Sequence, residues 1–145
     1  MHFDEASKKE ILQLVKKSGN NSYEDYLALR PDLCTLQNLS SVRGNLTEWL
    51  HVRPGSGILE IGAGGGGLTS GLLKASAKVT AVEQDLLYAD ILSARFRNER
   101  DFKLLNMDIE RALMVIRDAQ MTFGLIVVNM DTEMLEKKSA EAILE

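Results

Sequence analysis

The sequence is poor in cysteine, proline and aromatic residues, and it has no long apolar run. Its single cysteine, Cys34, excludes an internal disulfide and favours a reducing compartment. The longest apolar runs, such as residues 125–128, are far shorter than the roughly 18 residues that a membrane span needs. The first residues carry charges with no apolar stretch behind them, which is unlike a secretory signal peptide. We therefore expect a cytoplasmic protein with no membrane partner.

An excess of positive charge is also missing. The chain has 17 Lys and Arg residues against 21 Asp and Glu residues, so its net charge is -4 at pH 7. Because general nucleic-acid binders rely on a basic surface, this balance argues against one. The two histidines, His2 and His51, lack metal-ligand spacing, and we expect no metal site. A length of 145 residues with 45% hydrophobic residues is typical of one globular domain.

Helical spacing of apolar residues dominates the first third of the chain. The expected helices span residues 4–17, 22–29 and 40–50. One face of the last helix would carry Val42, Leu46, Trp49 and Leu50. Pro31 ends the second helix, because the residue before a proline avoids the helical conformation. We expect residues 1–56 to form a helical segment that packs on the sheet formed by the rest of the chain.

After residue 56, short apolar strands alternate with helical segments. The expected strands cover residues 58–61, 78–83, 102–107 and 123–129. The expected helices cover residues 68–74, 86–98, 109–118 and 131–145. This alternation is typical of β-α-β units, in which the strands are parallel and the crossovers right-handed. Residues 57–145 are therefore predicted to form an α/β core.

A glycine-rich loop, residues 62–67, follows the first expected strand directly. Each glycine loses much backbone entropy on folding, so four in a row are costly. Such a run is expected where the backbone turns sharply and a ligand approaches it closely. The alternative is a tight strand-to-helix turn without a ligand. The spacing of Gly62, Gly64 and Gly67 also satisfies the dinucleotide-binding fingerprint.

Glu60 distinguishes between two kinds of ligand. It lies inside the strand, where a buried carboxylate is costly unless it is paired or hydrogen-bonded. A nicotinamide dinucleotide would place its pyrophosphate at the helix N-terminus, where an acidic neighbour repels it. S-adenosylmethionine has no phosphate and carries ammonium and sulfonium charges, so it tolerates this carboxylate. We favour the second ligand and keep a nicotinamide-dependent oxidoreductase as an alternative.

The stretch from Glu60 to Gly66 resembles the E-x-G-x-G-x-G motif of class I S-adenosylmethionine-dependent methyltransferases. This resemblance implies a Rossmann-like, doubly wound parallel sheet in three α/β/α layers. It implies that Glu83 takes the ribose hydroxyls, that Asp108 lies near the adenine amino group, and that Asn129 ends a strand in the cleft. The predicted cofactor-binding residues are Glu60, Gly62, Ala63, Gly64, Gly66, Glu83, Gln84, Asp108, Ile109 and Asn129.

Several of these residues also have a purely structural interpretation. Glu83 would then be a solvated charge at a strand end, and Asn129 a turn residue. Asp108 also suits the N-cap of the helix that follows it. We expect Asp85 to cap a helix rather than contact a ligand, and Cys34 to be structural.

Two subfamilies are resembled in part, and the acceptor side departs from the pattern of one of them. Residues 67–69 and 79–85 resemble the ribosomal-RNA adenine dimethyltransferases, which hold the target amino group with an Asn-Leu-Pro-Tyr type motif. This chain has Asn-Met-Asp-Thr at 129–132, without the proline or the aromatic that would stack on an extruded base. Residues 39–46 also resemble methyltransferase domains attached to bacterial glycosyltransferases. We therefore expect a small-molecule acceptor and disfavour nucleic acid without excluding it.

The resemblance implies in-line displacement of the methyl group from sulfonium to a nucleophile, in which alignment alone is worth about 7–11 kcal/mol. No catalytic base can be named, and Asn129 and Asp131 are the local candidates. The family sheet has the strand order 3-2-1-4-5-7-6, and this sequence supplies only its first four strands. We expect either a cofactor-binding fragment or a homodimer that covers the edge of the fourth strand. A non-catalytic S-adenosylmethionine-binding module is the remaining alternative.

Overall fold

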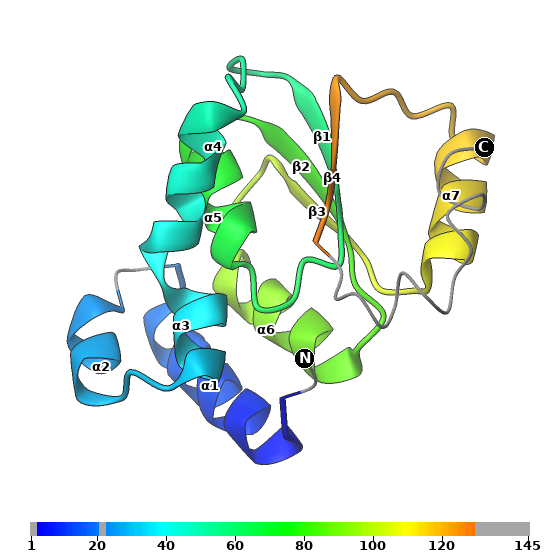
Figure 1. Cartoon of the computed structure of the whole chain (residues 1–145). Helices are drawn as coiled ribbons and strands as arrows, with labels where there is room; N and C mark the ends of the chain where they lie inside the picture. Colours follow the sequence, from blue (N-terminus) through cyan, green and yellow to red (C-terminus); the bar gives the residue numbers. More distant parts are fainter. Residues whose placement is uncertain (1–2, 21–22, 130–145) are drawn as a thin grey trace.

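Four parallel strands form the centre of the fold in the computed structural model, which describes residues 3–20 and 23–129 (Figure 1). The strands are β1 (Gly57–Ile61), β2 (Lys78–Val82), β3 (Phe102–Leu105) and β4 (Leu125–Val128). They lie in the order β3-β2-β1-β4, and all three pairings are parallel. This order confirms the predicted doubly wound sheet and places its switch point between β1 and β4.

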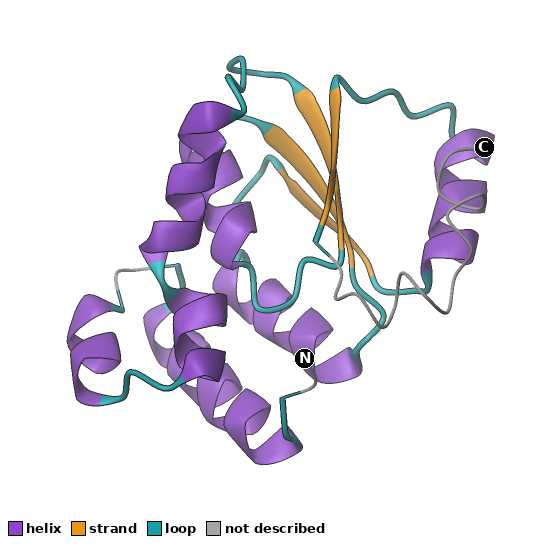
Figure 2. Cartoon of the chain, in the orientation of Figure 1, coloured by secondary structure: helices purple, strands orange, loops and turns teal. Residues whose placement is uncertain are grey.

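Helices cover both faces of the sheet (Figures 1 and 2). One face is covered by α5 (Gly67–Lys74) and α6 (Leu86–Arg95), and the other by α7 (Ile109–Asp118). Successive side chains of β1 point to opposite faces of the sheet, as in any strand. Ile58 packs with Leu72 of α5, whereas Leu59 belongs to a cluster with Ile116 of α7. The predicted three-layer arrangement is thus confirmed.

The N-terminal third is helical, with α1 (Glu5–Ser18), α2 (Glu24–Leu29), α3 (Leu33–Leu39), the 3-10 helix η1 (Ser41–Asn45) and α4 (Leu46–Trp49). Helix α1 packs on α6, whereas α3, η1 and α4 pack on α5, and α2 packs on α3 (Figure 1). A separate apolar cluster joins α1, α3 and α6 through Val15, Cys34 and Ile91. Cys34 is buried and unpaired there. The division of the chain at residue 56 stays a prediction.

The sequence interpretation missed α3. Asp32 caps this helix by accepting a hydrogen bond from the backbone N–H of Thr35 at 2.9 Å. An aspartate directly after Pro31 was the available signal, because Asp is a favoured N-cap residue. Two other expectations fall on Ser22 and on residues 131–145, which lie outside the described residues. No described helix is both long and apolar enough to cross a membrane.

The single helix expected over residues 40–50 was wrong in type and in orientation. The chain forms η1 and the short α4 instead, and its expected apolar face is exposed, with Trp49 at 82% and Val42 at 68%. The buried side carries Thr47, and Gly44 meets Gly71 of α5 backbone to backbone. Gly44 and Gly71 let the segment 41–49 approach α5 more closely than larger residues would allow. This close contact, rather than the apolar residues, decides which side of the segment faces the protein.

Replacing Gly71 with alanine tests this close approach. Glycine to alanine inside a helix usually stabilises by up to about 1 kcal/mol. Here the new Cβ would overlap Gly44, with the Gly44 carbonyl oxygen only 2.9 Å away. We expect Gly71→Ala to lower the free energy of unfolding by about 1–3 kcal/mol, as overpacking does.

Urea unfolding checks this expectation, with Gly124→Ala as the matched control. A Cβ at Gly124 would have only ordinary contacts, the nearest at 3.8 Å. Equal stability of the Gly71→Ala variant and the control would contradict the packing described above.

Candidate cofactor-binding site

The predicted site residues lie at the carboxyl ends of four adjacent strands. Asp108 follows β3, Glu83 follows β2, the glycine loop follows β1 and Asn129 follows β4. Because the strands are parallel, these ends share one edge of the sheet, where open α/β folds bind their ligands. The topology therefore brings together residues that are up to 69 positions apart in the sequence, from Glu60 to Asn129.

The glycine loop has a left-handed backbone at alternate positions. Gly62, Gly64 and Gly66 have φ angles of 77°, 56° and 85°. Residues with a side chain rarely adopt this conformation, so the fold requires glycine at these three positions. The zigzag turns the chain from β1 into α5 within a few residues.

Two buried polar residues hold the loop at Gly65. Asn38 of α3 accepts a hydrogen bond from the Gly65 N–H through its Oδ1 at 2.7 Å. Arg95 of α6 donates from one nitrogen to the carbonyl oxygens of Gly65 at 2.8 Å and Asn38 at 2.7 Å. Burial lowers the pKa of Arg95 to about 10, so the guanidinium stays charged at neutral pH. Both peptide groups of Gly65 are therefore fixed from outside the loop.

Part of the glycine run serves packing within the chain. A Cβ on Gly65 would lie 2.7 Å from Asn38 Oδ1, and a Cβ on Gly66 would lie 2.6 Å from the Phe96 ring. At Gly67 it would meet the Gln37 carbonyl oxygen at 2.7 Å. The sequence interpretation favoured a ligand as the group that approaches the loop and kept a tight turn without a ligand as the alternative. Three of these glycines are required by the chain's own residues, which no sequence pattern pointed to.

Glu60 lies fully buried beneath the loop, at 0% exposure. Its Oε2 accepts a hydrogen bond from Thr69 Oγ1 at 2.7 Å, whereas Oε1 has no partner in the described part of the chain. Burial raises the pKa of Glu60 to about 7, although the Thr69 bond and the charge of Arg43 oppose this shift. A buried carboxylate with an unpartnered oxygen fits a site that takes a positively charged ligand.

Glu83 presents a carboxylate whose orientation is fixed by two backbone groups. Oε2 accepts a hydrogen bond from the Gly64 N–H and Oε1 from the Asp85 N–H, both at 2.9 Å. Burial raises the pKa of Glu83, and the two N–H groups oppose that shift. A carboxylate has about four acceptor positions, so two remain for the hydroxyls of a ribose. The geometry therefore fits the predicted ligand.

The other predicted residues have visible structural roles. Asp108 caps α7 by accepting from the Arg111 N–H at 2.9 Å, and Asn129 accepts from Arg43 at 2.9 Å. The remaining side chains divide between the core and the surface, with Ala63 and Ile109 buried and Gln84 exposed. Their contacts with a cofactor stay predictions. Asp131, one of the two candidate bases, lies outside the described residues.

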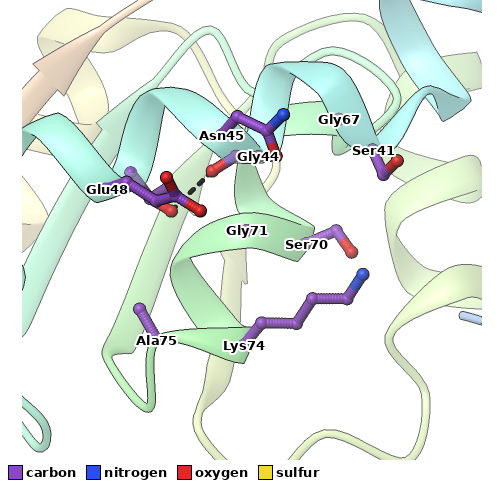
Figure 3. Close-up of a pocket in the computed structure, with 10 residues that line it drawn as sticks. Ser41, Gly44, Asn45, Glu48, Gly67, Ser70, Gly71, Lys74 and Ala75 are labelled. Atoms are coloured by element: carbon purple, nitrogen blue, oxygen red, sulfur yellow. Dashed lines mark hydrogen bonds between the residues drawn. The ribbon is translucent and has the colours of Figure 1, made fainter.

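A separate pocket of about 280 Å³ lies between η1, α4 and α5 (Figure 3). Ser70 and Lys74 of α5 line one side of this pocket, and Ser41 and Glu48 line the other. None of the predicted cofactor-binding residues lines it. Gly67, the last residue of the glycine-rich loop, is one of its lining residues, so the pocket adjoins the loop without including the predicted cofactor-binding residues.

Comparisons with known proteins place the chain among methyltransferases. The family model described as ribosomal RNA adenine dimethylase matches residues 40–124. A ribosomal RNA small subunit methyltransferase A from Borreliella burgdorferi is 40% identical over 68 residues, which are 47% of this chain and 24% of that protein. A chloroplastic ribosomal RNA small subunit methyltransferase from Arabidopsis thaliana is 38% identical over 69 residues, 48% of this chain and 20% of that protein. The matched region is about a quarter of the Borreliella protein.

A solved structure with the same fold is the O-methyltransferase from Bacillus cereus in complex with S-adenosylhomocysteine (SAH). The two structures align with a TM-score of 0.55 over 92% of this chain and 58% of that one, at 20% identity. At this identity the likeness shows the fold alone. It agrees with the parallel sheet and flanking helices described above.

Two expectations about the acceptor are overturned by these findings. The relatives are ribosomal RNA methyltransferases, which contradicts both the preference for a small-molecule acceptor and the judgement against nucleic acid. The first error came from a departure at residues 129–132, beyond the matched region. The second came from the net charge of the whole chain, which does not describe the local surface that meets a polyanion.

The prediction of an enzyme family that uses S-adenosylmethionine is confirmed over the nicotinamide alternative. The segments that resembled adenine dimethyltransferases, residues 67–69 and 79–85, lie within the matched region. Since the family model covers more than half of the sequence, the chain belongs to the ribosomal RNA adenine dimethylase family.

Proposed function

We propose that this chain binds S-adenosylmethionine at the glycine loop and that the protein transfers the methyl group to an adenine base of ribosomal RNA. The observation that carries the proposal is the orientation of Glu83. Its two oxygens are held by the N–H groups of Gly64 and Asp85, at the edge of the sheet where ligands of such folds bind. The family match and its named relatives support the acceptor.

Each part of the proposed site has a separate task. Glu83 accepts hydrogen bonds from the ribose hydroxyls, and the loop at Gly62–Gly66 lets the cofactor lie against bare backbone. Asp108, Ile109 and Gln84 border the adenine. Glu60 supplies a negative charge opposite the positive charges of the cofactor. Its side chain has no exposed surface, so it acts electrostatically through the loop rather than by direct contact.

We assign to the described residues the alignment of the cofactor methyl group with the acceptor amino group, and no acid or base role. When bound, S-adenosylmethionine supplies a methyl group activated by the sulfonium charge. Asn129 ends β4 beside the loop and is held by Arg43, so it is placed to border the acceptor amino group. Alignment of this kind is worth about 7–11 kcal/mol of the barrier.

We place the protein where small ribosomal subunits are assembled or modified. The cytoplasmic location expected from the sequence stays part of this proposal, and the Arabidopsis relative is named as chloroplastic. The compartment of the protein therefore depends on where the ribosomal RNA that it methylates is found.

Ligand affinity is expected to depend on pH through Glu60. Its pKa of about 7 leaves most of the carboxyl neutral at pH 6 and most of it ionised at pH 8. A ligand that carries an ammonium group binds the ionised form better, so we expect SAH to bind about tenfold more tightly at pH 8 than at pH 6. Isothermal titration calorimetry at both pH values measures this ratio, and Glu60→Gln should abolish it. A pH-independent affinity in the wild type would remove Glu60 from the proposed site.

The same ionisation has the opposite effect on the ligand-free protein. The folded state holds the Glu60 proton more tightly than the unfolded state, whose pKa is 4.5. Stability is therefore lost as pH rises from about 4.5 to about 7, by about 1.4 kcal/mol for each unit of pKa shift. Urea unfolding should show this loss in the wild type and its absence in Glu60→Gln.

RNA methylation tests the proposed acceptor. We expect the chain to transfer label from methyl-labelled S-adenosylmethionine to small-subunit ribosomal RNA stripped of protein, and digestion should recover the label in N6-methylated adenosine. Glu83→Ala removes the proposed ribose contact and should reduce transfer at least tenfold. Glu99→Ala, an exposed acidic change after α6, is the matched control and should leave transfer unchanged. SAH binding without any labelled adenosine would contradict the acceptor but not the cofactor.

A further inference from the structure

Helix α1 reaches the proposed cofactor-binding site through a partly buried ion pair. Lys8 is only 3% exposed, although lysine is among the residues least often buried. Its Nζ lies 2.6 Å from Asp85 Oδ2 and 4.4 Å from the centre of the Tyr88 ring. The lysine therefore joins α1 to the first turn of α6.

Asp85 passes this contact on to Glu83. Its Oδ1 accepts hydrogen bonds from the N–H groups of Leu87 and Tyr88, which caps α6. Its own backbone N–H donates to Glu83 Oε1 at 2.9 Å. One residue therefore binds Lys8 with its side chain and holds the proposed ribose-binding carboxylate with its backbone.

Glu83 has few other restraints on its side chain. Its second oxygen is held by Gly64, and its carbonyl oxygen accepts from Asn106 Nδ2 at 2.8 Å. A shift of Asp85 would remove the N–H from Oε1 and leave the carboxylate held on one side only. The orientation of the carboxylate therefore depends on where Asp85 lies.

The α1 helix lies outside the residues that the family model matches. The family model begins at residue 40, whereas α1 ends at Ser18. Its link to the site is thus a feature of this chain that the family match does not describe.

We propose that Lys8 is a positioning residue for the cofactor ribose, which holds Asp85 so that Glu83 keeps its binding orientation. This inference rests on the proposed function, because it assigns Glu83 to the ribose. Lys8 itself does not contact the ligand. Helix α1 therefore contributes to cofactor affinity indirectly, through the ion pair between Lys8 and Asp85.

The charge state of Asp85 agrees with this role. Burial raises the pKa of Asp85, but the hydrogen bonds from Lys8 and from the backbone of Tyr88 and Leu87 more than offset it, so the pKa lies below its usual value. The carboxylate is therefore ionised at neutral pH, and the ion pair with Lys8 is intact.

The test compares SAH affinity in single variants of the full chain. Lys8→Met keeps the length and apolar stem of the side chain and removes its charge. Asp85→Asn removes the ion pair but keeps a side chain that caps a helix well. We expect each variant to weaken SAH binding about tenfold at a temperature where circular dichroism shows it folded. The double variant should be no weaker than either single one, because the two residues form one interaction.

Lys9→Met is the matched control. Lys9 is the next residue on α1 and pairs at 3.1 Å with Glu5 on the exposed side of that helix. We expect this variant to bind SAH within twofold of the wild type, because its ion pair does not reach α6.

A second ligand separates positioning from loss of structure. The 2′,3′-dideoxy analogue of SAH lacks the hydroxyls that Glu83 is proposed to bind. If Lys8 acts through Glu83, Lys8→Met weakens SAH but leaves the affinity for this analogue unchanged. If Lys8 were only structural, the variant would weaken both ligands equally or neither, and the inference would be overturned. A wild type that binds neither ligand would overturn the proposed function, and the inference with it.

Discussion

The buried guanidinium of Arg95 is the interaction on which the rest of the site depends. It donates to the carbonyl oxygens of Asn38 and Gly65, and through Nε to Asn20 Oδ1 at 3.2 Å. One side chain of α6 therefore connects the N-terminal helices to the glycine loop. Removing it would leave buried carbonyl groups without donors, at a cost of about 1–3 kcal/mol for each group. The adjacent Phe96 packs against Gly66, so the end of α6 supports two consecutive residues of the loop.

Around this support, the ligand-facing edge of the sheet gathers buried negative charge. Glu60 and Glu83 are both buried, and burial raises the pKa of each carboxyl. The negative charge of Glu83 raises the pKa of Glu60 further. In the ligand-free protein this arrangement opposes ionisation and so costs stability at neutral pH. A cationic ligand would recover part of that cost on binding. In the proposed site, the stability lost by burying these carboxylates would favour binding of a positively charged cofactor.

The sheet could be predicted because each strand is a short apolar run followed by a glycine, an acidic residue or an asparagine. Such a run can be recognised from the local sequence, without knowing which distant residues pack on it. The sequence also predicted the Asp85 cap and offered a cap as the alternative role of Asp108, because both caps are local hydrogen bonds. Asn38 and Arg95 could not be predicted, because their partners are backbone groups 27 to 57 positions away. The orientation of the segment 40–50 was predicted wrongly for a similar reason, since the contact that sets it is made by Gly44 and Gly71, two residues with no apolar side chain to signal it.

We have proposed that S-adenosylmethionine binds at the glycine loop, which Asn38 and Arg95 hold in place. The most direct measurement is an NMR titration of the nitrogen-15-labelled chain with SAH. The account predicts that the largest amide shifts fall at Gly62–Gly66, at 83–85 and at 106–109. Shifts concentrated instead on Ser41–Glu48 and Ser70–Lys74, around the separate pocket, would contradict it.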